Sequence, residues 1–213
     1  LSGLVTLLYG VGRLLIELVV VLAGVGLIVG SLSLTGLSGT LVNDLLSLAG
    51  DDIGLLLFMG AATSFVLGIG MTVTAAYIFL AVVLAPALVS QSLDPLSVHL
   101  FILYWAMLSY ITPPVALGAY AAASIAQSNP LKTGFAAMRL GSVIYVIPFI
   151  FVLDVAFILQ GPWHQSLQAF AEAIVGAWFI CAGLQGYLAG LGSLASIPSR
   201  TLIAFGGLAI ALP

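Results

Sequence analysis

The stretch GIGMTVTAAY, residues 68–77, interrupts a long apolar run with two glycines and two threonines. The apolar segments on either side, residues 53–67 and 75–89, are each only 15 residues long. A helix needs about 20 apolar residues to cross a bilayer. Two short halves around a polar tip therefore predict a re-entrant helical hairpin over residues 53–90. Two separate spans in the same stretch remain an alternative.

The composition indicates whether this chain is surrounded by water or by lipid. Of its 213 residues 62% are hydrophobic and 5% are charged, and the mean hydropathy is +1.30. An aqueous surface needs roughly a quarter of the residues to be charged. We therefore predict an all-α polytopic membrane protein, in contact with lipid. The chain has only four Lys and Arg residues, and they form no cluster that could neutralise phosphate groups. Nucleic-acid binding is therefore not predicted.

A second interruption follows in residues 97–127, which contain the sequence SYITPPV at positions 109–115. Proline removes a backbone donor and pushes the preceding residue away from helical angles. Pro113 and Pro114 should therefore unwind residues 110–115. The pattern predicts one transmembrane helix that is broken in two.

The rest of the chain is expected to supply ordinary helices. Residues 1–52 would hold one span, residues 14–34, with Arg13 and Glu17 paired at its entry, and then an interfacial connection or short amphipathic helix. Residues 138–213 would hold C-terminal transmembrane helices, with crossings at 140–160 and 169–191 and a last apolar run from residue 201. With a re-entrant hairpin, the basic residues fall on one side of the membrane and four aspartates on the other: Arg13, Lys132, Arg139 and Arg200 against Asp44, Asp51, Asp52 and Asp94.

Irregular backbone survives inside a bilayer only where protein packs around it or where it lines a wet cavity. Unwound carbonyl groups and hydroxyl side chains can replace the water shell of a small cation, and helix N-termini, here near Thr74 and Val115, can face an anionic substrate. The glycines would allow tight backbone turns. Close packing of small residues is the alternative explanation. The predicted sodium and substrate site comprises Gly68, Gly70, Thr72, Thr74, Ser109, Thr112, Pro113 and Pro114.

The other polar residues are predicted to have structural roles. Asp154 lies in an apolar helix, where a proton relay is the alternative, and Glu172 should find a polar neighbour. His99, at the start of the broken helix, and His164, in a loop, lack further ligands at metal-binding spacing. Cys181 is expected to be a small buried hydrophobe. No nucleophile and base form a recognised pair, so an enzyme is not predicted.

Three segments together resemble a known family. LGIGMTVTAAYIFLAVVLAPALV, HLFILYWAMLSYITPPVALGAYAAASIA and the pair GFAAMRLG and IPFIFVLD are similar to the fused-permease branch of the tripartite ATP-independent periplasmic (TRAP) transporters. The resemblance covers roughly residues 35–190. It differs at the hairpin tip, where fused permeases commonly carry proline and threonine and this chain has Thr72 and Val73.

The resemblance implies a fold, a function and partners. The large membrane subunit of that family has two inverted repeats of the ion-transporter-superfamily type, and this chain resembles the second, C-terminal one. The family implies sodium-coupled import of a carboxylate-bearing solute through the inner membrane by an elevator-type movement. Implied partners are a periplasmic solute-binding protein, the N-terminal half of the permease, a small membrane subunit or fused domain, and lipid. Sodium is the coupling ion, with protons left open, and no cofactor is expected.

Two rival functions remain. A scaffold subunit would use its polar breaks to bind a partner protein. An ion channel also tolerates broken helices, although no repeated filter motif is present.

Overall fold

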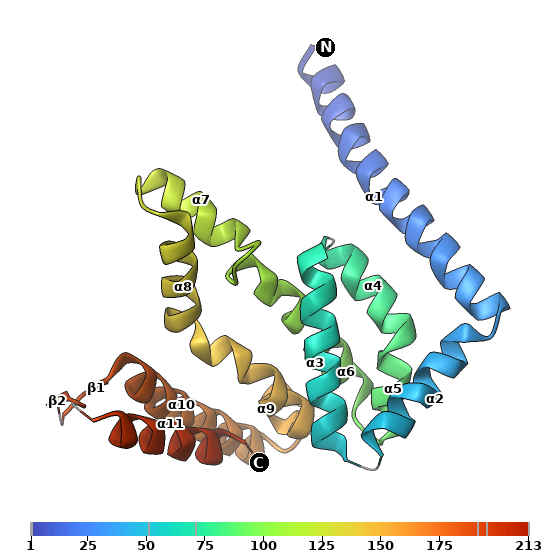
Figure 1. The fold of residues 1–213 in the computed structure, drawn as a ribbon. Helices are drawn as coiled ribbons and strands as arrows, with labels where there is room; N and C mark the ends of the chain where they lie inside the picture. The colour runs from blue at the N-terminus through green and yellow to red at the C-terminus, as the bar shows by residue number, and fades with distance from the viewer. Residues whose placement is uncertain (1, 51, 71, 191, 195, 213) are drawn as a thin grey trace.

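The computed structural model describes residues 2–50, 52–70, 72–190, 192–194 and 196–212. The chain is almost entirely helical, as the composition predicts. It begins with α1 (Ser2–Leu34), which contains the predicted span of residues 14–34 within a longer helix, and α2 (Leu37–Ala49), the expected short connecting helix. Figure 1 shows α1 extending away from the remaining helices. The side chain of Glu17 and all of Asp51 lie outside the described residues, so their predicted roles stay predictions.

Two helical arms form in the region of the predicted hairpin, and they pack against each other. The arms are α3 (Ile53–Gly70) and α4 (Val73–Val83), followed by the short helix α5 (Ala85–Ser90) with Pro86 in its first turn. Next comes α6 (Pro95–Met107), which packs against both arms (Figure 1). The first arm is longer than the sequence predicts, because Gly68 and Gly70 continue α3 and do not unwind it.

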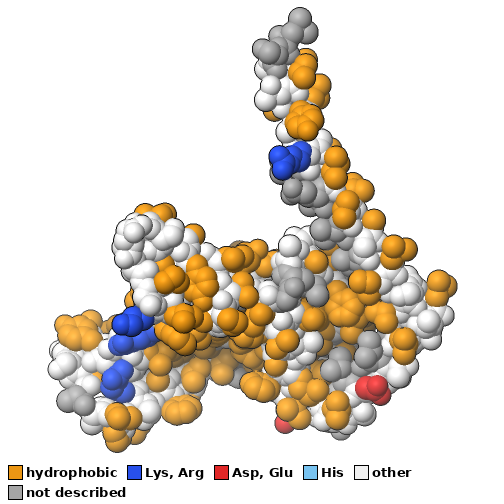
Figure 2. All heavy atoms as spheres, turned by 45° about the horizontal axis from the view of Figure 1, so that its top comes forward, with side chains coloured by type: hydrophobic (Ala, Val, Ile, Leu, Met, Phe, Trp, Pro, Cys, Tyr) orange, Lys and Arg blue, Asp and Glu red, His pale blue; other side chains and the backbone are white. Residues whose placement is uncertain are grey.

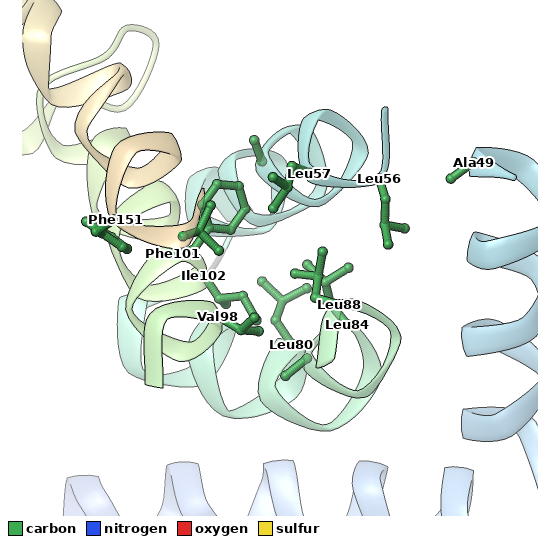
Figure 3. Close-up of a cluster of buried hydrophobic side chains, with 13 residues drawn as sticks. Ala49, Leu56, Leu57, Leu80, Leu84, Leu88, Val98, Phe101, Ile102 and Phe151 are labelled. Atoms are coloured by element: carbon green, nitrogen blue, oxygen red, sulfur yellow. The ribbon is translucent and has the colours of Figure 1, made fainter. Parts of the chain in front are cut away.

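Apolar side chains from these helices form the main core. Leu56 and Leu57 of α3, Leu80 of α4, and Phe101 and Ile102 of α6 are buried and face one another (Figure 3). Each such side chain stabilises the packed state by about 1.5–3 kcal/mol where the alternative is water. The hairpin and α6 thus form one packed unit, which holds the tip in place.

The helical run is interrupted at the predicted place, and whether its two halves form one broken transmembrane helix stays a prediction. A 3₁₀ turn, η1 (Leu108–Tyr110), continues α6, and residues 111–116 are irregular before α7 (Leu117–Ile125) begins. After α7 the chain turns into α8 (Pro130–Leu140). The expected boundary at residue 138 therefore falls inside a helix.

The predicted crossing at residues 140–160 is wrong as one continuous helix. The structure has η2 (Ser142–Tyr145), α9 (Ile147–Leu153) and η3 (Val155–Ile158), and the axis bends by 68° between α8 and the η2–α9 segment. Pro148 lies in the first turn of α9, where its missing N–H costs nothing. The Asp154 carboxylate accepts a hydrogen bond from the Ala156 amide at 2.9 Å and so starts η3.

The C-terminal part is a helical pair joined by a small hairpin of strands. It consists of α10 (Trp163–Gln185), β1 (Tyr187–Leu188), the antiparallel β2 (Gly192–Ser193) and α11 (Ile197–Ala211). The predicted 169–191 span is shifted, because Gly186 with φ +75° ends α10. His164, predicted in a loop, lies in the first turn of α10. Among the described residues, α10 is the single unbent helix long and apolar enough to cross a membrane, and the bent pair 130–140 and 142–153 would be a second span.

Glycines let α10 and α11 approach closely (Figure 1). A methyl group added at Gly207 would lie 2.6 Å from the Gly176 carbonyl oxygen, whereas nothing lies within 4 Å of one added at Gly206. Changing Gly207 to alanine should therefore destabilise the pair by about 1–3 kcal/mol through overpacking. Gly206→Ala has the same gain in helix propensity and should be neutral or stabilising. Thermal unfolding in detergent compares the two variants, and equal midpoints would contradict the close packing.

Candidate functional site

On the described side of the hairpin tip, Thr72 precedes the first turn of α4. Thr72 is extended, with φ −65° and ψ 149°, and its hydroxyl oxygen accepts a hydrogen bond from the Ala75 amide at 3.3 Å. This is a helix N-cap, a position that threonine favours. The predicted helix start near Thr74 therefore lies at Val73. The side chains of Thr72 and Thr74 are exposed in this chain.

Gly68 has a different role from the predicted one. It lies inside α3, and a methyl group added to it would be 2.5 Å from the carbonyl oxygen of Ala106 in α6. The absence of a side chain therefore lets α3 lie directly on the backbone of α6. The same Ala106 oxygen accepts a hydrogen bond from the Ser109 hydroxyl at 2.9 Å. The hairpin thus contacts α6 at Ala106, whose carbonyl group also binds the Ser109 hydroxyl of the following 3₁₀ turn.

Two buried hydroxyl groups line the break. Ser109 is 0% exposed and Thr112 is 5% exposed. Thr112 Oγ1 donates to the Leu108 carbonyl at 2.7 Å, so both hydroxyl groups use their hydrogen on a helix carbonyl. Each oxygen then has only lone pairs left to offer. That arrangement suits a cation ligand better than an anion ligand.

The backbone of the break is held in an uncommon conformation. Ala116 is fully buried and has φ +37°, in the left-handed region that residues with a side chain seldom adopt. Its amide donates to the carbonyl oxygens of Ser109 at 3.0 Å and of Thr112 at 3.1 Å. Strain of this kind persists only where the surroundings impose it, and it is concentrated at functional sites. α7 therefore begins at Leu117, two residues later than predicted, without a side-chain cap.

Several carbonyl groups of the break have no donor. Pro113 and Pro114 carry no N–H and are joined by a cis peptide bond. Within the described part of the chain, no hydrogen bond reaches the carbonyl oxygens of Ile111, Pro113 or Pro114. Backbone carbonyl groups inside a membrane protein need a partner. Water, a cation or a donor from another part of the protein can fill this role, because these residues are half-buried or exposed.

Tyr145 is a site residue that the sequence did not reveal. Its hydroxyl is hydrogen-bonded to Thr112 Oγ1, and because Thr112 donates to Leu108, Tyr145 is the donor. The ring of Trp105 stands edge-on to Tyr145 with centroids 6.0 Å apart, and the buried Trp105 Nε1 has no partner among the described residues. Tyr145 escaped notice because its segment was predicted as continuous helix. The bend after α8 is what turns η2 toward the break.

The α8 helix also packs against the break. A methyl group at Gly134 would lie 2.7 Å from Pro113 Cγ, and one at Gly141 would lie 3.2 Å from Ile111 Cδ1. Two glycines and Tyr145 therefore hold the irregular segment from one side. The hairpin holds its beginning from the other side, through Gly68.

Replacing Tyr145 by phenylalanine tests the predicted sodium site: it should weaken the predicted sodium binding without unfolding the protein. The ring packing on Trp105 stays, but the hydrogen bond that fixes the Thr112 oxygen is lost. A lost hydrogen bond of this kind is worth about 0.5–1.5 kcal/mol, which corresponds to roughly a 2- to 10-fold weaker affinity. Sodium titration of the thermal midpoint measures it. An unchanged sodium affinity would show that Tyr145 does not position Thr112.

The predicted site residues are only partly brought together. Gly68, Ser109, Thr112 and Pro113 lie in or against the packed break, while Pro114 is exposed. Gly70 ends α3 in helical conformation and forms no turn. No hydrogen bond among the described residues joins Thr72 or Thr74 to the break.

The remaining polar candidates have local partners. Glu172 accepts a hydrogen bond from Gln168 at 2.8 Å, and Asp154 caps η3, in line with their predicted structural roles. His99 Nδ1 lies 3.2 Å from the Tyr77 hydroxyl, which links α6 to α4. Cys181 is half-buried within α10.

Comparison with protein-family models decides the family. Residues 1–165 match the model described as "Tripartite ATP-independent periplasmic transporter, DctM component". The chain belongs to this family. The predicted TRAP permease is thereby confirmed, and the chain is a membrane permease component from a family of transporters, not of enzymes. The match includes the hairpin and the break and stops at the start of α10. Comparisons with curated proteins and with solved structures returned no match.

Proposed function

We propose that this permease imports a carboxylate-bearing solute through the inner membrane and that a sodium gradient drives the import. The broken helix would bind the sodium ion, and the hairpin beside it would carry ion and solute across in an elevator-type movement. A periplasmic binding protein would deliver the solute. The N-terminal half of a TRAP permease and a small membrane subunit or fused domain would complete the assembly.

One observation carries the sodium proposal. The Ser109 and Thr112 hydroxyl groups donate their hydrogens to helix carbonyl groups, and Thr112 also accepts from Tyr145, so each oxygen keeps a lone pair for a cation. The carbonyl groups of the same irregular segment at residues 111, 113 and 114 lack donors among the described residues. Oxygen ligands without a carboxylate suit a monovalent cation, as in other transporters with broken helices. A proton could not use such a set, because none of these oxygens is basic at neutral pH.

The substrate proposal rests on the second half of the broken helix. α7 begins after Ala116, whose side chain makes no cap, so the first amides of α7 remain available. A helix N-terminus favours a carboxylate through these amides and its dipole. The hydroxyl groups of Thr72 and Thr74 at the hairpin tip are exposed. They can contribute to the same ligand only where another part of the permease covers the tip.

Uptake by the reconstituted permease tests the proposal. The complete permease in liposomes, supplied with its binding protein and a labelled dicarboxylate or sugar acid library, should accumulate one solute when external sodium is present. Replacing sodium by potassium should abolish accumulation. Uptake that follows a proton gradient alone would refute sodium coupling. If ions flow down any ion gradient in the absence of a binding protein, a channel would be favoured. If the protein assembles normally but transports nothing, a scaffold would be favoured.

A further inference from the structure

Two arginine side chains from α8 and α11 meet the end of α10, and no carboxylate of the described residues pairs with either. Arg200 of α11 donates from Nε to the Gly183 carbonyl at 3.0 Å and from Nη2 to the Leu184 carbonyl at 2.7 Å. Arg139 of α8 donates from Nη2 to the Gln185 carbonyl at 3.1 Å. Three consecutive carbonyl groups at one helix end thus bind two guanidinium groups from two other helices. The two positive charges therefore lie close together.

The helix end compensates only part of this charge. A helix C-terminus carries about −0.5 elementary charge, against two full positive charges. Neither arginine has a carboxylate partner in the described part of the chain. Glu172, on the same helix, lies 12 residues before Leu184, or about 18 Å along the axis, and is bonded to Gln168. The site is left with a net positive charge that attracts an anion.

Both guanidinium groups have N–H groups that donate to no described residue. Gly186, with φ +75°, has no side chain, and a methyl group there would lie 3.0 Å from Arg200 Cζ. The guanidinium therefore lies flat on the turn that ends α10. Its Nη1 donates to no described residue, and Arg139 uses only one of its nitrogen atoms. Arg139 is exposed, so an anion can reach both.

An apolar hollow adjoins the charges. It lies between α10 and α11, and its walls include Leu184, Ile197 and Ala204 beside Arg200. Figure 2 shows basic side chains over the end of the molecule formed by α8, α10 and α11 and also on α1, whereas the acidic side chains that it shows lie away from α8, α10 and α11. A ligand that is anionic at one end and apolar at the other matches both parts.

The position along α10 places this site at lipid headgroup level. With 23 residues the helix is about 34 Å long, close to the ~30 Å hydrocarbon thickness. Exposed Trp163 at its start suits one interface, so the arginines lie at the other. Basic residues favour the cytoplasmic side, where the leaflet is anionic.

We propose that Arg139 and Arg200 at the C-terminal end of α10 form a binding site for the phosphate group of an anionic phospholipid, whose acyl chain lies in the hollow between α10 and α11. The lipid would tie α8 to the α10–α11 pair. The site lies outside the break, and its test does not depend on the proposed sodium coupling.

Phosphatidylglycerol binding to the complete, delipidated permease in neutral detergent tests this site. Thermal stability should rise in a saturable way with phosphatidylglycerol but not with phosphatidylcholine of the same acyl chains. Arg139→Gln, which keeps an N–H for the Gln185 carbonyl, should weaken the phosphatidylglycerol affinity about 5-fold, because one basic residue contributes about that factor. Arg200→Lys, which keeps the charge but loses the planar fork, should weaken it less than Arg139→Gln.

Lys132→Gln is the matched control. It removes one exposed basic side chain of the same helix, α8, whose ammonium group binds no α10 carbonyl. It should leave the lipid affinity unchanged. Equal losses for Lys132→Gln and Arg139→Gln, or equal stabilisation by both lipids, would overturn the proposal. Saturable stabilisation by inorganic phosphate alone, with no further effect of phosphatidylglycerol, would overturn the assignment to lipid.

Discussion

Replacing Gly68 by valine should destabilise the hairpin by about 2–3 kcal/mol and abolish sodium-dependent uptake. A side chain at this position would start 2.5 Å from the Ala106 carbonyl oxygen and 3.0 Å from Ala106 Cα. Both are backbone atoms of α6 and cannot rotate away, so α3 must move outward. Overpacking of this kind typically costs 1–3 kcal/mol. The movement would also displace the hairpin from the break at Ser109, where the proposed ion site begins.

The control for this variant is Gly10→Val in α1. A methyl group added at Gly10 meets nothing within 4 Å, so only the small propensity change applies. Thermal unfolding in detergent and uptake in liposomes compare the two variants. If Gly68→Val keeps both the midpoint and the uptake of the unchanged protein, the close approach of α3 and α6 is not what holds the site.

Replacing Thr112 by valine should weaken sodium binding by at least about 10-fold. Valine has nearly the shape of threonine, but it removes an oxygen that donates to the Leu108 carbonyl, accepts from Tyr145 and keeps one lone pair for an ion. It also leaves the Tyr145 hydroxyl without its acceptor. A tenfold loss corresponds to about 1.4 kcal/mol, a modest value for one oxygen ligand in a site without carboxylates. The sodium concentration that gives half-maximal stabilisation is the quantity to measure.

Thr63→Val is the matched change for this experiment. Thr63 is an exposed residue of α3 whose hydroxyl donates to its own helix at Met59, 2.8 Å away. The Thr63→Val variant should bind sodium with the affinity of the unchanged protein. If Thr112→Val and Thr63→Val both bind sodium as tightly as the unchanged protein, the ion is not bound at the break.

The sequence predicts the two interruptions because both depend on local chemistry. Pro113 and Pro114 disrupt a helix through their missing N–H groups and the clash of their rings with the preceding turn, and Thr72 is a natural helix cap between two apolar arms. The hairpin and the broken helix are therefore found at nearly the expected residues. Their membrane topology, re-entrant or spanning, stays a prediction.

What the sequence could not predict depends on contacts between distant segments. The sequence predicts turns at Gly68 and Gly70. In the structure Gly68 instead allows α3 to contact the α6 backbone at Ala106, and no local sequence pattern encodes that contact. Tyr145 reaches Thr112 only because Gly141 and Pro148 interrupt what reads as one apolar span. The pairing of Arg139 with α10 likewise spans 46 residues. Each of these features arises from packing and not from periodicity.

The most direct test of the sodium proposal is a titration of thermal stability with sodium against potassium at constant ionic strength. It uses the complete permease, purified in neutral detergent without its solute. A ligand that binds only the folded protein raises stability by mass action, by about 2.7 kcal/mol at 100 times its Kd. We expect a saturable rise with sodium, no rise with potassium, and a curve shifted to higher concentration in Thr112→Val. Identical curves for the two ions would contradict the account, and the donor-free carbonyl groups of the break would then need another partner.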